Sequence, residues 1–515
     1  MDAIRSSGTL VHPTSFPSGY GIGDLGEKAY QFIDYLVDTN QGNWQILPLG
    51  PTGFGNSPYA SYSAFAGNPY LISPDLLREK GLLEEKELAK HRLPQGTSVD
   101  YDKAYAIKDE LFRLACKRFY ERNDRDEQKR FKEFKKENEV WLDDYVLFMS
   151  CLLENGKRPW NQWDEKLARR EKKALDGARK KLEKSIESQY WVQFEFFEQW
   201  MALRKYASDK GIRIIGDIPI FVDHNSSDVW ANKRFFDVDE TGNRLLVAGV
   251  PPDYFSETGQ LWGNPLYRWK ELEKDGYQWW IDRFNQMFIM FDAIRVDHFR
   301  GFDAYWEIKA DEKTAENGRW VKGPGEKLFK AIEKKLGKLP IIAEDLGVIT
   351  ASVVKLRDSF GFPGMKVLQF AFDDPGNGFL PHNYHDSNCI VYSGTHDNDT
   401  TLGWYEQAPE VEKNYLREYT QSDGSDVSWQ LIRIGMLSVA NQAIFPLQDF
   451  MELDGEHRMN FPGTTENNWM WRYTDDMLNG LDRNRIRHII GISNRNPNDV
   501  RTDSNLSDID TEEPG

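Results

Sequence analysis

Eight short apolar runs dominate the pattern of hydrophobic and polar positions along this chain, and most are separated by stretches of helical periodicity. A strand that is buried on both faces has a continuous apolar run rather than an alternating one, so we interpret these runs as buried parallel strands. They lie at residues 8–15, 43–50, 213–222, 291–299, 340–347, 365–372, 389–397 and 441–450.

Apolar residues at helical spacing mark the segments before or after several of these runs, at 27–38, 191–207, 279–290 and 325–337. Alternation of strands and helices is typical of a parallel sheet, and eight such units fit a closed (β/α)8 TIM barrel better than an open sheet. The sequence therefore predicts an α/β protein of the TIM-barrel class. Two separate α/β domains are the alternative.

Two intervals are too long for simple connections, and we expect them to be insertions into a single catalytic domain spanning residues 1–493. Residues 75–190 are highly charged and helix-forming, which favours an inserted helical subdomain with solvated faces over a coiled-coil partner site. Residues 223–267 are rich in Gly, Pro, Asn and aromatic residues, which predicts a long lid loop over the strand ends. The polar, acidic residues 494–515 predict a disordered tail.

Net charge, apolar runs and cysteine content limit the classes of partner and the cellular compartment that we expect. A formal charge of −17 argues against nucleic acid and anionic membranes as partners. No apolar run approaches the roughly 18 residues of a membrane helix, and the first residues lack the basic start and apolar stretch of a secretion signal. The three cysteines, Cys116, Cys151 and Cys389, form no CxxC pair, so we expect a cytoplasmic protein without disulfides or zinc. No cofactor is implied.

Three of the apolar runs lead into a carboxylate: Asp297, Glu344 or Asp397. The C-terminal ends of the strands are where a β/α barrel builds its active site, and two carboxylates in different environments are the minimum for breaking a glycosidic bond. Arg295 would favour the ionised form of Asp297, whereas the apolar residues before Glu344 would raise its pKa toward a general-acid role. Each acid alone is more simply an N-cap or an ion-paired loop residue. Three together, beneath a lid, favour sugar chemistry.

The segments AIRVDHFRG, IIAEDLG and SGTHDN, in this order, resemble the catalytic signature of the 4-α-glucanotransferases, glycoside hydrolase family 77 of the α-amylase superclan. The resemblance covers nearly all of residues 8–480. It implies a retaining double displacement in which Asp297 is the nucleophile, Glu344 the general acid and base, and Asp397 a ligand of the sugar hydroxyls. By the same resemblance, Arg295 holds the nucleophile and His396 binds the sugar at the cleavage point.

Further segments resemble the same family and imply additional substrate-binding residues. These are Ser57 and Tyr59 for the donor sugars, Asp253 and Trp262 in the lid over the cleft, Asn460 and Pro462 near the acceptor, and Asp217 at the end of the third strand. Asp217 is almost as well explained as a structural carboxylate. The glycines of GYGIGDLG do not form a nucleotide-binding loop, and we interpret the isolated His12 and His298 as structural residues rather than metal ligands.

The resemblance favours transfer between α-1,4-glucans, because a lid can exclude water and hold an acceptor. Malto-oligosaccharides and α-1,4-glucans are therefore the expected partners, and we expect a monomer or a homodimer. An α-glucan hydrolase of the same clan and a non-catalytic glucan-binding protein are the alternatives. The three acids argue against the second alternative.

Overall fold

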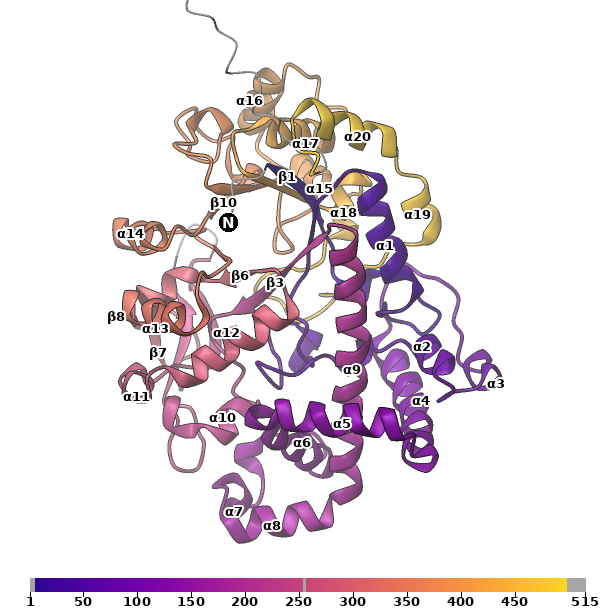
Figure 1. The fold of residues 1–515 in the computed structure, drawn as a ribbon. Helices are drawn as coiled ribbons and strands as arrows, with labels where there is room; N and C mark the ends of the chain where they lie inside the picture. Colours follow the sequence, from indigo (N-terminus) through magenta and orange to yellow (C-terminus); the bar gives the residue numbers. More distant parts are fainter. Residues whose placement is uncertain (1–4, 253–255, 498–515) are drawn as a thin grey trace, which may run out of the picture.

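The computed structural model describes residues 5–252 and 256–497, and a parallel sheet of eight strands lies at its centre (Figure 1). The strands follow one another around the sheet in chain order, and each coincides with one of the eight apolar runs. They are β1 (Ser6–Leu10), β2 (Asn43–Gln45), β3 (Arg213–Pro219), β6 (Ala293–Asp297), β9 (Ile341–Ala343), β10 (Gly364–Val367), β11 (Cys389–Tyr392) and β12 (Gln442–Pro446).

The sheet curves into a nearly closed barrel. Strand β1 pairs in parallel with both β12 and β2, which joins the two ends of the chain. At the remaining seam, the N–H of Ala343 at the end of β9 donates to the carbonyl of Pro363, immediately before β10, at 2.9 Å. Gly8 permits the close approach of β1 to β2, because a Cβ there would lie 2.4 Å from the Asn43 carbonyl oxygen. The predicted TIM barrel is confirmed.

Helices cover the outside of the barrel, and their apolar faces pack onto the strands. The main covering helices are α1 (Glu27–Asp38), α9 (Glu183–Asp209), α12 (Gln278–Met290), α13 (Glu326–Leu336), α14 (Ala351–Ser359), α17 (Val427–Leu437) and α20 (Arg483–Ile492). The indole of Trp200 on α9 illustrates the contact, because it packs between the rings of Trp44 and Phe291 at the inner layer. The helical periodicity at 27–38, 191–207, 279–290 and 325–337 therefore identified real crossover helices.

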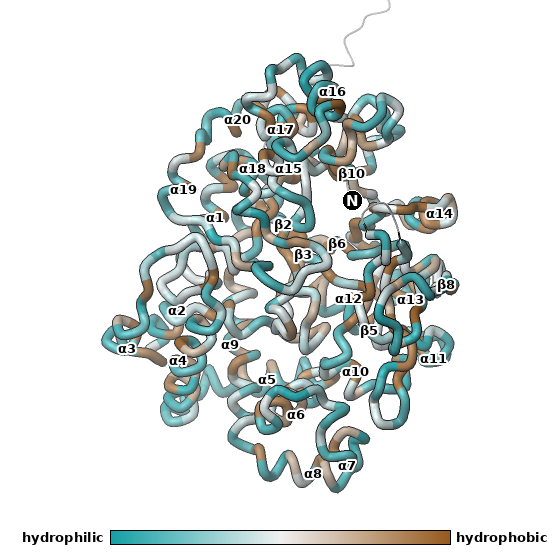
Figure 2. The backbone as a smooth tube through the Cα atoms, turned by 180° about the vertical axis from the view of Figure 1, so that it is seen from behind, coloured by the Kyte–Doolittle hydropathy of each residue, from teal (hydrophilic) through white to brown (hydrophobic). Residues whose placement is uncertain are grey.

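The charged interval 75–190 is helical. It begins within α2 (Pro74–Glu79), ends in the first turns of α9, and contains α3 (Glu85–Ala89), α4 (Tyr101–Arg122), α5 (Arg125–Glu137), α6 (Glu139–Glu154), α7 (Glu165–Ala168) and α8 (Lys172–Lys181). Phe119, Phe131 and Phe194 pack edge-to-face or tilted where α4 and α5 meet α9. Figure 2 shows largely hydrophilic turns on the outer helices and hydrophobic segments toward the strands. One continuous hydrophobic cluster joins this subdomain to the barrel.

The predicted lid loop, in contrast, has regular structure of its own. Residues 223–267 contain α10 (Ser227–Ala231), β4 (Leu246–Val250) and β5 (Gln260–Pro265), and β4 pairs with β7 (Ala304–Lys309), which pairs with β8 (Gly318–Lys322). The sequence did not predict this antiparallel sheet, because β5, β7 and β8 mix polar and apolar residues without strict alternation and β4 is an apolar segment of only five residues inside a Gly- and Pro-rich interval. The part of the lid that carries Trp262 is therefore β5, an edge strand of a small sheet, where we expected an irregular loop.

The N-terminal ends of β1 and β12 are closed by a residue beyond the predicted domain boundary. Arg495 is 0% exposed, and its guanidinium donates to six main-chain carbonyls: those of Ser6, Gly435, Met436, Ser438, Ala440 and Asn441. Ordered structure thus extends past residue 493, and the predicted tail start at 494 was wrong. The remainder of that tail, residues 498–515, lies outside the described residues. Within the described part of the chain, no helix has the length and apolarity needed to cross a bilayer.

Candidate active site

A chain of charges links two acids at the C-terminal ends of β3 and β6. Arg295 donates from one terminal nitrogen to Asp217 at 2.6 Å and from the other to Asp297 at 2.9 Å. Side chains at 295 and 297 share one face of β6, since side chains alternate along a strand. The side chain of Arg295 is nearly fully buried, whereas that of Asp297 is 28% exposed. Asp297 is therefore oriented by a buried cation and still reachable from the cleft.

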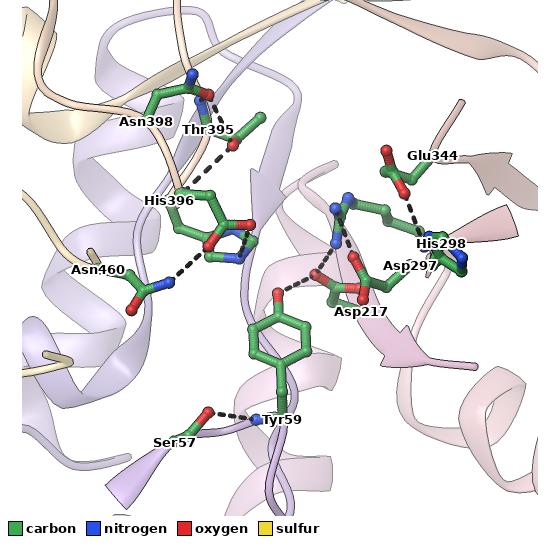
Figure 3. A network of polar contacts seen from close by, with 12 residues as sticks. Ser57, Tyr59, Asp217, Asp297, His298, Glu344, Thr395, His396, Asn398 and Asn460 are labelled. Carbon is green, nitrogen blue, oxygen red and sulfur yellow. Dashed lines mark hydrogen bonds and ion pairs between the residues drawn. The ribbon is translucent and has the colours of Figure 1, made fainter. Parts of the chain in front are cut away.

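Glu344 lies beside Asp297 because their strands are neighbours. The register pairs Val296 of β6 with Ala343 of β9. Asp297 directly follows the first of these residues and Glu344 directly follows the second. Adjacent strands are about 4.8 Å apart, a spacing compatible with the roughly 5–5.5 Å that separates the carboxyls of a retaining pair. The main-chain N–H of His298 donates to one carboxylate oxygen of Glu344 at 2.7 Å (Figure 3). The N–H of Leu346 donates to the other at 2.9 Å.

The two acids differ in their electrostatic surroundings. Burial, and then the negative charge of Asp297, raise the pKa of Glu344 well above its ordinary value, against the opposing effect of Arg295. Burial also raises the pKa of Asp297, but its direct ion pair with Arg295 counters that effect. The first proton of the pair is therefore lost mainly from Asp297 and the second is held mainly by Glu344.

Asp397 faces this pair from the loop after β11. Asn460 donates an amide N–H to one carboxylate oxygen of Asp397 at 2.7 Å, and His396 Nε2 lies 3.2 Å from the other. Burial opposes ionisation of Asp397, but His396 and the hydrogen bond from Asn460 outweigh it and hold the pKa of this acid below its usual range. Asp397 is thus a fixed anion with its charge turned toward the cleft.

Tyr59 lies between the two groups of polar residues (Figure 3). Its hydroxyl donates to Asp217 at 2.7 Å, and its ring stacks on His396 with centroids 5.2 Å apart and an interplanar angle of 14°. Ser57 acts one step further away, because its hydroxyl accepts a hydrogen bond from the Tyr59 N–H at 3.2 Å and so shapes the turn that carries the tyrosine.

The lid reaches the acids through an aromatic contact. Trp262 on β5 is 38% exposed and packs edge-to-face on His298, with ring centroids 4.8 Å apart. Pro462 is exposed in the loop that carries Asn460. Asp253, the other lid residue predicted from sequence, lies outside the described residues. Most of the predicted site residues therefore converge on one cleft, and Ser57 and Pro462 lie at its margin.

Three residues that were not predicted as site residues help to build the site. Arg458 donates to the Asp397 carbonyl at 3.0 Å and to the Asn460 carbonyl at 2.8 Å, which ties the loop after β11 to the C-terminal loop. Asp449 accepts the Ser393 hydroxyl and the N–H of Thr401, and so fixes both ends of the segment that carries Asp397.

The third residue is His298, which we interpreted from sequence as a structural residue and whose N–H contacts Glu344. It lies inside the motif AIRVDHFRG, so the signal was present, but nothing in one sequence distinguishes a positioning residue from its neighbours. The described residues contain no group of three or more His, Cys, Asp or Glu that could hold a metal ion.

Comparisons with known proteins identify the family to which the chain is similar. The model of the family described as 4-alpha-glucanotransferase, glycoside hydrolase family 77, matches residues 11–478. The 4-alpha-glucanotransferase of Synechocystis sp. is 50% identical over 479 residues, covering 92% of this chain and 95% of the relative. That of Thermus thermophilus is 49% identical, covering 95% of this chain and 98% of the relative.

Solved structures give the same result. An amylomaltase from Streptococcus agalactiae, solved in complex with acarbose, matches with a TM-score of 0.92 at 40% identity, covering 95% of this chain and 99% of that one. The amylomaltase from Corynebacterium glutamicum, at 17% identity and a TM-score of 0.76, shares the fold.

Proposed function

The chain belongs to the 4-alpha-glucanotransferase family, and we propose that Asp297 is its nucleophile, Glu344 its general acid and base, and Asp397 the anion that binds the sugar at the cleavage point. The enzyme transfers segments of a 1,4-α-glucan to the 4-hydroxyl of an acceptor by retaining double displacement. One observation carries the residue roles: Asp297 and Glu344 end neighbouring strands in environments that separate their pKa values.

In the first step, a carboxylate oxygen of Asp297 forms a bond to C1 of the donor glucose while the bond from C1 to the bridging oxygen breaks. Glu344 gives its proton to that leaving oxygen. The raised pKa of Glu344 keeps a proton available near neutral pH, and Arg295 keeps Asp297 ionised for attack. Asp397 and His396 would accept and donate hydrogen bonds to the hydroxyls of the same sugar.

The second step needs the opposite protonation state of Glu344. Once Asp297 is esterified it carries no negative charge, so the Coulombic contribution that helped to raise the pKa of Glu344 disappears. The two N–H donors from His298 and Leu346 then favour the carboxylate. Glu344 accepts the proton of the acceptor's 4-hydroxyl, whose oxygen bonds to C1 and releases Asp297. The site thus changes its own acid into a base.

Transfer rather than hydrolysis requires that an acceptor glucan competes with water. The partly exposed Trp262 presents an aromatic face above the nucleophile's neighbour His298, which suits stacking against a second sugar. Acarbose is bound in the Streptococcus agalactiae amylomaltase, and we propose malto-oligosaccharides and α-1,4-glucans as the ligands of the same cleft here. A monomeric or homodimeric state, a cytoplasmic location and one catalytic unit over residues 1–493 stay proposals.

Incubation with maltotriose tests the proposed function. We expect a ladder of longer maltodextrins together with released glucose, at a constant number of reducing ends, since each transfer breaks and forms one bond. A steady rise in reducing ends would instead identify a hydrolase. The Asp297→Asn variant, followed by mass spectrometry in parallel, should yield neither product, and normal turnover in this variant would contradict the assigned nucleophile.

A further inference from the structure

We propose that His298 is a positioning residue that couples the lid strand β5 to Glu344, so that the state of the lid reaches the acid and base through this one residue. The inference rests on the proposed role of Glu344 and goes beyond it, because it adds a connection between substrate cover and proton transfer. Three features of His298 carry it: its backbone conformation, the seat of its ring, and its contact with Trp262.

The backbone of His298 is left-handed, with φ of +50°. Residues with a side chain rarely adopt this conformation, so it persists only where the surroundings determine it. Here it turns the chain sharply after the strand end at Asp297 and directs the His298 N–H to Glu344 Oε2 at 2.7 Å. The carbonyl of Glu344 accepts the next N–H, from Phe299, at 3.1 Å. The turn and the acid are thus fastened to each other.

The ring of His298 is held between two neighbours. A Cβ at position 301 would lie 3.2 Å from the ring's Cδ2 atom, so Gly301 leaves just enough room for the imidazole on one side. On another side, Trp262 packs edge-to-face at 4.8 Å and 86°. Burial lowers the pKa of His298 to about 3, so the ring is neutral at working pH. It also has a buried Nε2 atom without a hydrogen-bond partner among the described residues.

Because the imidazole is neutral, it brings no charge that could act on Glu344 directly, and its influence on the acid passes through its packing. Because Trp262 is 38% exposed above the cleft, a glucan that stacks on this indole changes the packing on the His298 ring. Ring and N–H belong to the same residue, so that packing bears on the hydrogen bond that favours ionised Glu344. A filled cleft would in this way stabilise the turn that holds the base in place for the acceptor.

Two substitutions separate the ring from the backbone. His298→Asn removes the imidazole but tolerates the left-handed conformation, so we expect the N–H to stay on Glu344 and the pH profile of kcat/KM to stay close to wild type. His298→Ala removes the same ring but disfavours that conformation. Its weakened N–H contact should raise the pKa of Glu344 and move the basic limb of the profile to higher pH. A melting curve for each variant confirms that it is folded.

A double-mutant cycle with Trp262→Ala tests the coupling itself. If the lid acts through His298, then Trp262→Ala lowers kcat in the wild-type background but has an effect at least about threefold smaller in the His298→Asn background. Leu261→Ala is the matched control, because Leu261 precedes Trp262 on the same strand with a similar exposed fraction of 36% and points to the opposite face. Its effect should be the same in both backgrounds.

Two results would overturn the proposal. The first is that Trp262→Ala lowers kcat by the same factor in the wild-type and His298→Asn backgrounds. The second is that His298→Asn and His298→Ala have identical pH profiles of kcat/KM. Glu344→Gln, measured beside them, keeps this failure distinct from a failure of the assigned function. If Glu344→Gln retains near-normal turnover, the acid itself is misassigned. If it abolishes turnover while the cycle is additive, only the coupling is wrong.

Discussion

The two ends of the barrel are built from the same eight strands but treat charge in opposite ways. At the N-terminal end, Arg495 is fully buried and gives its N–H groups to six main-chain carbonyls. At the C-terminal end, Asp297 lies beside Glu344 and raises the pKa of that acid, and both acids interact with the single cation of Arg295. Both ends bury charge, and burial together with Arg5 lowers the pKa of Arg495 to about 9. The buried cation is nevertheless surrounded by carbonyl acceptors, whereas the C-terminal end keeps acids of like charge next to each other.

This difference between the two ends shows which polar groups stabilise the fold and which are kept for catalysis. Polar groups that are fully hydrogen-bonded stabilise a structure, whereas carboxyl groups with raised pKa values weaken it when they ionise. The two neighbouring acids persist at the C-terminal end because Arg295 pairs with Asp297 and main-chain donors hold Glu344 in place. We therefore expect substitutions at the C-terminal end to remove activity and substitutions at the N-terminal end to remove stability.

The largest effect should come from the nucleophile. Asp297→Asn keeps the shape of the side chain but cannot form the ester, so kcat should fall by at least about 10⁴-fold, as for other catalytic nucleophiles. The melting temperature should stay the same or rise, because a buried negative charge has been removed. Steady-state rates on maltotriose and a thermal scan check both parts. A variant that is inactive because it is unfolded would contradict the contrast between the ends.

Loss of the general acid should be smaller. Glu344→Gln should lower kcat by about 10²- to 10⁴-fold, the usual contribution of a positioned acid and base, and the basic limb of the pH profile should vanish with it. A donor whose leaving group needs no protonation, such as a nitrophenyl maltoside, separates the two steps. Its first step should be rescued in the variant, and a donor-independent loss would argue against the acid role.

Substitutions at the N-terminal end should change the free energy of unfolding rather than the catalytic rate. Arg495→Met removes six hydrogen bonds from a buried cluster, although Arg5 still donates to three of the same carbonyls. We therefore expect the free energy of unfolding to fall by at least about 1 kcal/mol. The folded fraction should keep its kcat, because the substitution lies at the opposite end of the barrel from Asp297. Arg495→Lys is the matched control, since an ammonium can satisfy at most three of the six carbonyls and should recover part of the loss. Chemical denaturation and active-site titration measure the two quantities.

The sequence predicted the barrel because its strands are buried on both faces and its crossover helices are amphipathic, so each level of pattern gives the same answer. It predicted the acids because their position at strand ends and their surrounding motifs coincide. It did not predict β4, β5, β7 and β8, whose residues follow neither a continuous apolar run of strand length nor a strict alternation of polar and apolar positions. It also placed Arg495 in a disordered tail, because a buried arginine that binds carbonyls is indistinguishable in sequence from a solvated one.

The positioning residues were missed for a related reason. Arg458, Asp449 and His298 act through contacts that span 61, 48 and 46 positions of the chain, to Asp397, Thr401 and Glu344. No local pattern reports such a contact. Asp217 shows the same limit in another form, since only the structure reveals that it anchors both Arg295 and Tyr59.

The smallest expected effect is on the pH dependence of stability, and it tests most directly how the neighbouring acids at the C-terminal end affect each other's ionisation. Because folded Glu344 holds its proton more tightly than unfolded Glu344, its contribution to stability is complete below the ordinary glutamate pKa of about 4.3. That contribution is lost as pH rises toward the raised value. Glu344→Gln removes the loss, so the variant should gain about 1 kcal/mol or more over wild type between pH 5 and pH 8.

Asp397→Asn supplies the opposite sign within the same cleft. The pKa of Asp397 lies below its usual range because His396 and Asn460 outweigh burial, so its ionised form stabilises the fold above the ordinary aspartate pKa of about 3.9. Asp397→Asn should therefore be less stable than wild type at neutral pH and regain parity only in acid. Unfolding free energies at several pH values measure both variants. Parallel curves for the two would mean that the acids share one environment, and the electrostatic division of labour in the cleft would be lost.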